Sequence, residues 1–147
     1  MRPANKSLRE KSAARMAAAQ MLYANALNGS KPDPARMLQE HDGYLSENKT
    51  QPNMALLKKL LEGVVTHGNT LEPWIDKALT GDWKKDRMSP LLLAILRLAV
   101  FELAEMRQTA SPIIVNEYVT LTGQFFGDAE TGFMNAVLNA LAVELRA

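Results

Sequence analysis

The side chains in this sequence that could support catalysis or bind a metal ion are few. The chain has no cysteine, which removes disulfides, thiolate zinc sites and cysteine nucleophiles, and it has two histidines, His41 and His67. Neither histidine has another histidine or a carboxylate at a metal-ligand spacing on the same helix face. No glycine-rich phosphate loop and no serine-hydrolase motif occurs either. The sequence therefore predicts a protein that is not an enzyme and holds no metal.

Basic residues gather near the N-terminal end, and the chemistry open to them is contact with phosphate. Up to Tyr23, five basic residues stand against one acidic residue, a net charge of +4, whereas the whole chain carries +1. The five are Arg2, Lys6, Arg9, Lys11 and Arg15. Lys11 and Arg15 lie one helical turn apart and are expected to project away from the packed side of their helix. Two interpretations stay open here: a solvated helix surface, or a surface that contacts phosphate or an acidic partner.

Two phenylalanines flank a short glycine-bounded turn late in the chain. Phe126 precedes Gly127, and Phe133 follows Gly132. Aromatic rings beside a basic surface are the groups on which unpaired RNA bases stack. Packing in the core is the more common position for a single phenylalanine, so the spacing alone leaves both interpretations open.

Arg97 is a charged residue in the middle of the most apolar segment of the chain. A buried guanidinium without a partner costs several kcal/mol, so a carboxylate or a phosphate is expected beside it. Glu102 is expected to face away, which leaves Glu117 of the following helix as the better internal candidate. The sequence thus predicts a structural pair of Arg97 and Glu117 inside the protein, with phosphate binding as the alternative.

All of these residues are predicted to lie on helices or in the short turns between them. The chain has 147 residues, about the size of one domain, with 47% hydrophobic and 22% charged residues. No segment alternates with period two, so the fold class is all-α, a compact bundle of about seven helices. No secretory signal and no segment long enough to span a membrane is evident, so a cytoplasmic protein is expected.

Capping and breaking residues predict where the helices begin and end. Ser7 and Glu10 have the spacing of a capping box, and prolines at the first helical position favour further starts. The expected helices run from Ser7 to Asn28, from Asp33 to Gly43, from Asn53 to Leu79 as two helices or one with a kink near Gly68–Pro73, from Ser89 through Leu103, from Ser111 to Gly127, and from within residues 128–131 onward. Residues 44–53 are expected to form a loop.

Five segments, in order and spacing, carry a resemblance to a known family. They are AAQMLY at residues 18–23, LLEGV at 60–64, ILRLAVFEL at 95–103, VNE at 115–117 and FMNAVLN at 133–139. Together they resemble the NusB family of bacterial transcription antitermination factors, loosely from residue 13 to 60 and closely from there to residue 139. The resemblance implies a single all-helical domain made of two small subdomains, residues 1–80 and 81–147.

The resemblance also implies a function. Members of this family pair with the ribosomal protein NusE, and the pair binds the boxA element of ribosomal RNA leaders. With NusA and NusG on RNA polymerase, the complex suppresses premature, largely Rho-dependent, termination. Neither catalysis nor a cofactor is implied.

By position, the resemblance assigns RNA binding to a basic set, an aromatic set and an acidic set. These residues are Lys6, Arg9, Lys11, Arg15, Tyr23, Phe126, Asp128, Glu130 and Phe133. Lysines and an acid are mixed into residues 5–12, where relatives carry arginines, so a partner is expected to contribute more of the RNA affinity.

One alternative comes from another class of protein, and a second concerns the oligomeric state. The chain could be a helical interaction module in ribosome biogenesis, because the same fold occurs fused to ribosomal RNA methyltransferases. It could also form a homodimer that covers the RNA surface, with Tyr23, Leu92 or Phe126 at the interface.

Overall fold

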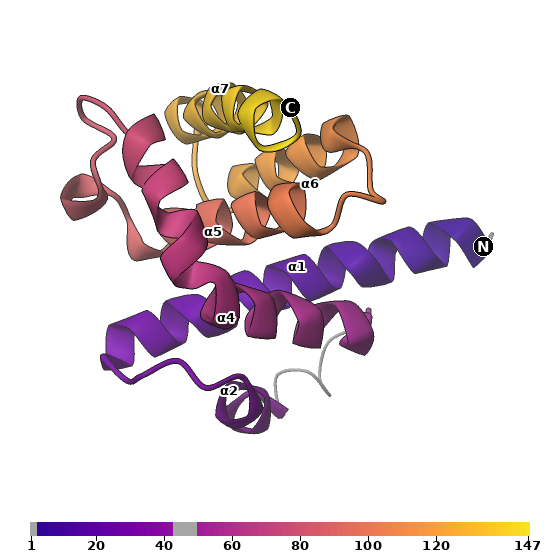
Figure 1. The fold of residues 1–147 in the computed structure, drawn as a ribbon. Coiled ribbons are helices and arrows are strands. Elements are labelled where there is room, and N and C mark those ends of the chain that lie inside the picture. The colour runs from indigo at the N-terminus through magenta and orange to yellow at the C-terminus, as the bar shows by residue number, and fades with distance from the viewer. Residues whose placement is uncertain (1–2, 43–49) are drawn as a thin grey trace. The chain divides into compact units, whose positions relative to one another are not determined.

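The computed structural model describes residues 3–42 and 50–147, and in these ranges the only regular structure is helical (Figure 1). The elements are α1 (Pro3–Asn28), α2 (Pro34–Glu40), α4 (Met54–Ala78), a short 3-10 helix η1 (Lys85–Arg87), α5 (Pro90–Glu105), α6 (Ser111–Gly123) and α7 (Asp128–Leu145). The all-α prediction is confirmed, and the six α-helices of these ranges come close to the expected number. The predicted stop at Gly43 and most of the predicted loop lie outside the described residues.

The chain divides into two compact units, Met1–Thr66 and His67–Ala147. The division falls within α4, earlier in the chain than the subdomain boundary expected near residue 80. No helix of the described residues is both long and apolar enough to cross a bilayer.

In the first unit, small side chains make up much of the buried surface of α1. Ala14, Ala17, Ala18 and Ala19 are buried together with Met21. Alanine has the highest helix propensity and a small side chain, so this stretch favours both a long helix and close packing. Gly29 has a φ of +66° directly after the helix, a conformation that glycine adopts without steric cost.

Polar contacts hold the ends of the elements of this unit. Asp33 caps α2, because its carboxylate accepts a hydrogen bond from the Ala35 N–H at 3.2 Å. Arg36 of α2 donates to the side-chain oxygen of Asn25 on α1 at 2.8 Å. The N–H of Asn53 donates to the Glu10 carbonyl at 2.8 Å, which ties the start of α4 to α1.

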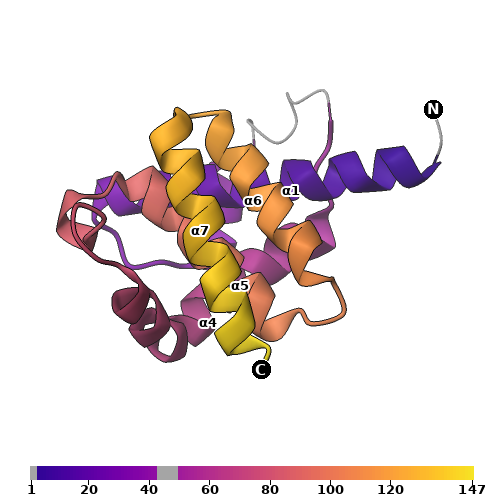
Figure 2. The ribbon, with the colours of Figure 1, turned by 90° about the horizontal axis from the view of Figure 1, so that it is seen from above.

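In the second unit, α5 is apolar nearly all round and packs against α6 and α7, which also pack against each other (Figure 2). Its start is the predicted one, since the Ser89 hydroxyl accepts a hydrogen bond from the Leu91 N–H at 3.2 Å and Pro90 is the first residue. At its other end, the guanidinium of Arg146 donates to carbonyls that the helix leaves unpaired, among them those of Leu103 at 2.8 Å and Met106 at 3.2 Å.

Two helix boundaries differ from the sequence prediction, and one alternative that it left open is settled. Helix α1 begins at Pro3 and not at Ser7, because proline fits the first turn of a helix. Residues 54–78 form one helix that contains Pro73. Of the two predicted alternatives, two helices or one, the structure therefore has one. Helix α6 ends at Gly123 and not at Gly127, because the Thr122 carbonyl accepts hydrogen bonds from the N–H groups of both Phe125 and Phe126 and so tightens the turn.

Candidate nucleic-acid interface

The first turns of α1 present the predicted basic residues to solvent. Lys6, Arg9 and Lys11 are exposed, and residues 5–9 are exposed without interruption, which covers every direction around the helix. No acidic residue lies in the first turn. Cationic side chains on an exposed helix end can approach phosphate groups without first losing their water, so this segment suits an electrostatic contact.

The later members of the predicted set on α1 are less accessible. Arg15 is buried, with 5% of its surface exposed, and it interacts with other groups of the protein. The prediction that Arg15 projects away from the packed side of its helix is therefore wrong. Arg15 lies on the side of α1 that carries the buried Ala18 and Ala19, one turn further on, and not on the half-buried side of Ala13, Met16 and Gln20. Tyr23 is half-buried.

The turn between α6 and α7 holds a second group of predicted residues, all in the second unit. Phe126 is half-buried, Asp128 is exposed, and Phe125, which the sequence analysis did not select, has 38% of its surface exposed. Glu130 has a structural task, because its carboxylate accepts a hydrogen bond from the Gly127 N–H at 3.2 Å and so caps the start of α7. Of the two acidic candidates, Asp128 is therefore the more available to a ligand.

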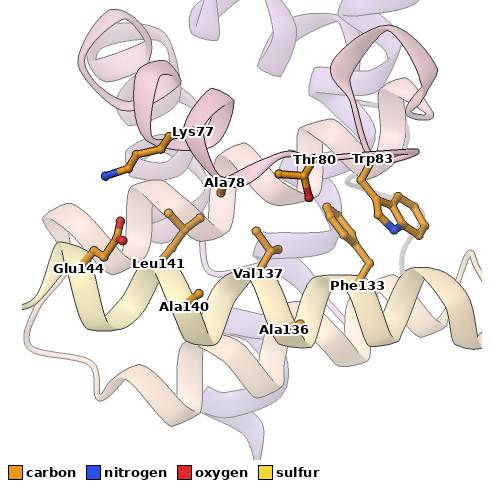
Figure 3. A pocket seen from close by; sticks show the side chains of 10 residues that line it. All are labelled: Lys77, Ala78, Thr80, Trp83, Phe133, Ala136, Val137, Ala140, Leu141 and Glu144. Atoms are coloured by element: carbon orange, nitrogen blue, oxygen red, sulfur yellow. The ribbon is translucent and has the colours of Figure 1, made fainter.

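Phe133, on the first turns of α7, is stacked on a tryptophan that the sequence analysis did not assign to the site. The rings of Phe133 and Trp83 have centroids 4.3 Å apart and planes inclined by 17°. Both rings are half-buried and line a pocket of about 450 Å³ beside α7 (Figure 3). A tryptophan within the charged connector of residues 81–87 was the available sequence signal, because an aromatic ring among lysines is typical of nucleic-acid contacts.

The partner of Arg97 is Glu72 of α4, and the prediction of Glu117 is wrong. The Nη2 and Nε groups of Arg97 donate to the Glu72 carboxylate at 2.8 and 3.2 Å, respectively. The Arg97 side chain keeps 37% of its surface exposed, so the pair is half-buried and not internal. Sequence spacing could not reveal that Glu72 is the partner of Arg97. Glu72 lies on α4, and a connector with several charged residues separates α4 from α5.

Lys85 extends this pair into a cluster of four charges. Its Nζ lies 2.5 Å from the Glu72 carboxylate and 2.6 Å from that of Asp76. Burial by itself would raise the pKa of Glu72, but hydrogen bonds and attraction from Arg97 and Lys85 outweigh it and leave the pKa below its ordinary value. The cluster joins the second half of α4 to η1 and α5, and thereby fixes the segment from which Trp83 projects.

Glu102 is a buried acid that the sequence analysis expected to face away. Its side chain is fully buried on α5, and the hydroxyl of Tyr118 on α6 donates a hydrogen bond to it. A buried carboxylate needs such donors, which accounts for a tyrosine among the apolar residues of α6.

Among the residues that the structure describes, no three histidine, cysteine, aspartate or glutamate side chains are grouped so that they could hold a metal ion. Neither histidine therefore belongs to a metal centre of that kind. His67 stacks on Phe101 with ring centroids 5.7 Å apart, and its Nδ1 lies 4.0 Å from the Glu105 carboxylate.

Comparison with known proteins gives one consistent result. Residues 12–143 match the model of the NusB family. The transcription antitermination protein NusB of Sinorhizobium fredii is 34% identical over 148 residues, which cover 96% of this chain and 91% of that protein. The corresponding protein of Rhizobium rhizogenes is 33% identical over 152 residues, 99% and 92% of the two chains. The solved structure of T. maritima NusB is similar in fold, with a TM-score of 0.75, 19% identity and 91% of each chain covered.

Proposed function

This chain belongs to the NusB family, and we propose that it is a non-catalytic, RNA-binding transcription antitermination factor of the bacterial cytoplasm. In this proposal it pairs with the ribosomal protein NusE, and the pair binds boxA RNA in the leaders of ribosomal RNA. The complex then joins NusA and NusG on RNA polymerase and suppresses Rho-dependent termination. The observation that carries the proposal is the exposed basic end of α1 in a chain that matches the family over nearly its whole length.

Lys6, Arg9 and Lys11 are the proposed phosphate contacts. Their exposure supports this role, because surface cations gain free energy by releasing the counterions of a nucleic acid. Arg15 is left out of the contact set because it is buried.

Phe126, Phe133 and Tyr23 are the proposed stacking groups, and Asp128 is the proposed acceptor for a base edge. Half-buried rings support this role, since one part of each ring is held by the protein and another part is open to a base. An exposed carboxylate repels phosphate but accepts hydrogen bonds from base amino groups, so it favours selection of bases over affinity.

We propose that the RNA contacts come from both subdomains, residues 1–80 and 81–147. Basic residues of the first and aromatic residues of the second are both needed in this proposal. The modest number of cations on α1 supports a strong dependence on the protein partner, because each single-strand phosphate contact contributes only a part of the affinity.

Transcription in vitro tests the function itself. A template carries boxA upstream of a Rho-dependent terminator, and read-through is measured with polymerase, Rho, NusA, NusG and NusE, with and without this protein. We expect read-through to rise when the protein is added and to fall back when boxA is replaced by a scrambled sequence. Equal read-through in all mixtures would contradict the proposal.

A further inference from the structure

Of the residues that line the pocket beside α7, the proposed contacts use only Phe133. The lining residues of the pocket come from two directions, the end of α4 with the segment that follows it, and one side of α7 (Figure 3). Its volume of about 450 Å³ falls within the range of about 300–1,000 Å³ that is typical of ligand sites. Apart from two charges and Thr80, the lining is apolar or aromatic, which suits a flat ring better than a solvated ion.

The stacked rings of Trp83 and Phe133 form one end of this pocket. Trp83 covers one face of Phe133, so a ligand ring cannot stack on that face of Phe133. A ligand ring on this side contacts Trp83, which Phe133 supports from behind. An aromatic pair of this kind is larger and more rigid than a single phenylalanine, so it loses less freedom when a base stacks on it.

Local backbone geometry sets the position of Trp83 in advance. Gly81 has a φ of +60°, in the left-handed region that glycine favours, and the Trp83 N–H donates to the Thr80 carbonyl at 3.1 Å. The turn thus returns the chain towards α7, and the neighbouring Lys85 is fixed to Glu72 and Asp76. The indole is therefore presented by an ordered segment.

The charges at the other end of the pocket are Lys77 and Glu144. Both are exposed, and neither forms an ion pair or a side-chain hydrogen bond among the described residues. A lysine left unpaired on the rim can meet a phosphate, while the carboxylate can accept from a base amino group. Both charges lie at the end of the pocket away from the rings, so the phosphate that Lys77 can meet is one that adjoins the stacked base along the same strand.

We propose that Trp83, backed by Phe133, and the adjoining pocket form a subsite for one unpaired nucleobase of a bound RNA strand, with Lys77 at an adjoining phosphate. This rests on the proposed function, because it adds a position to the same RNA path. It makes Trp83 a binding residue that the resemblance did not assign.

The chain has two tryptophans, so replacing Trp74 by phenylalanine leaves Trp83 as the single reporter of its own site. This variant, with equimolar NusE, is titrated with single-stranded boxA RNA while tryptophan emission and the anisotropy of labelled RNA are recorded. We expect the RNA to quench Trp83. Trp83→Leu should weaken binding about fivefold or more, in keeping with about 1–3 kcal/mol per stacked base.

Two further variants separate stacking from charge and from folding. Trp83→Phe keeps an aromatic ring and should restore most of the affinity that Trp83→Leu loses. Lys77→Gln should lower the dependence of log affinity on log salt by about 0.7, whereas Trp83→Leu should leave this slope unchanged. Circular dichroism melting of each variant checks that the fold is retained.

The results that overturn the inference differ from those that overturn the function. Tight RNA binding with no quenching and equal affinity for Trp83→Leu would sink the subsite while leaving the function intact. Quenching by NusE alone, with no further change on adding RNA, would make the pocket a protein docking site instead. Absence of RNA binding by the parent mixture would contradict the proposed function.

Discussion

At the scale of single residues, burial separates Lys11 from Arg15 although the two stand one turn apart on the same helix. Lys11 is exposed, and Arg15 has 5% of its surface exposed. Their shared charge and spacing predicted a shared role, which the packing of α1 does not allow. The distinction matters because removing an exposed cation weakens binding, whereas removing a buried cation leaves its partner groups unsatisfied and destabilises the fold.

Lys11→Ala is expected to weaken RNA binding without changing the melting temperature. The loss of one phosphate contact should lower the slope of log affinity against log salt by about 0.7, the value for a single strand. Titration of labelled RNA at several salt concentrations measures this slope. Lys58→Ala, which removes an exposed lysine from α4, is the matched control.

Arg15→Ala is expected to lower the free energy of unfolding by about 1–3 kcal/mol. The reason is that truncation removes the interactions of a buried side chain and leaves its partner groups unsatisfied. Urea denaturation followed by circular dichroism measures the change. An unchanged midpoint would show that the side chain is not held as the structure has it.

At the scale of elements, Arg146 closes the C-terminal end of α5 from outside that helix. Its guanidinium donates to the carbonyls of Leu103, Thr109 and Met106 at 2.7 to 3.2 Å. Carbonyls at a helix end have no partner within the helix, so a single planar cation with several donors can satisfy several of them. The end of α7 is thereby joined to the α5–α6 connection.

Arg146→Ala should therefore destabilise the protein by about 2 kcal/mol, which for a chain of this size corresponds to a fall in melting temperature of several degrees. The neighbouring Arg107 is exposed and donates to two carbonyls, so Arg107→Ala should cost less. Calorimetry of the two variants compares them, and equal melting temperatures for Arg146→Ala and the parent would contradict the capping role.

The cluster around Glu72 predicts a dependence on pH. Since the folded protein holds the pKa of Glu72 below its ordinary value of 4.5, the unfolded chain binds more protons as the solution becomes acidic. The stabilisation is complete above pH 4.5 and is lost as pH falls through the lower, folded pKa. Its size is about 1 kcal/mol for a half-buried cluster.

Glu72→Gln removes this contribution, so its stability deficit should be largest near neutral pH and should shrink in acid. Urea denaturation at a series of pH values measures the deficit. Glu62→Gln, which alters an exposed glutamate earlier on the same helix, should show no such trend. A deficit for Glu72→Gln that is constant with pH would argue against the shifted carboxylate.

Local chemistry predicted the starts of α2 and α5 correctly, but not the start of α1 or the end of α6. Asp33 and Ser89 cap as expected, because a side-chain oxygen next to a proline acts within one turn of the chain. The end of α6 was wrong, because it depends on how the carbonyl of Thr122 is shared between two N–H groups and not on the next glycine. The partner of Arg97 was also out of reach, since three-dimensional packing chooses between Glu72 and Glu117.

At the scale of the whole molecule, the helical period and five short motifs were enough to predict the fold class and the family. The accessible surface was not predictable in the same way. Composition places cations on α1 and rings near α7, but it does not tell that Arg15 is buried, that Glu130 caps a helix, or that Trp83 backs Phe133. Those facts depend on contacts between elements that are far apart in the sequence.

The most direct test of an RNA-binding member of this family is a fluorescence-anisotropy titration of labelled boxA RNA at two salt concentrations, with and without NusE. A scrambled RNA of equal length is the control. We predict binding that is tighter with NusE, weaker at the higher salt concentration, and weaker for the scrambled RNA. No binding of boxA RNA in either mixture at low salt would contradict the account.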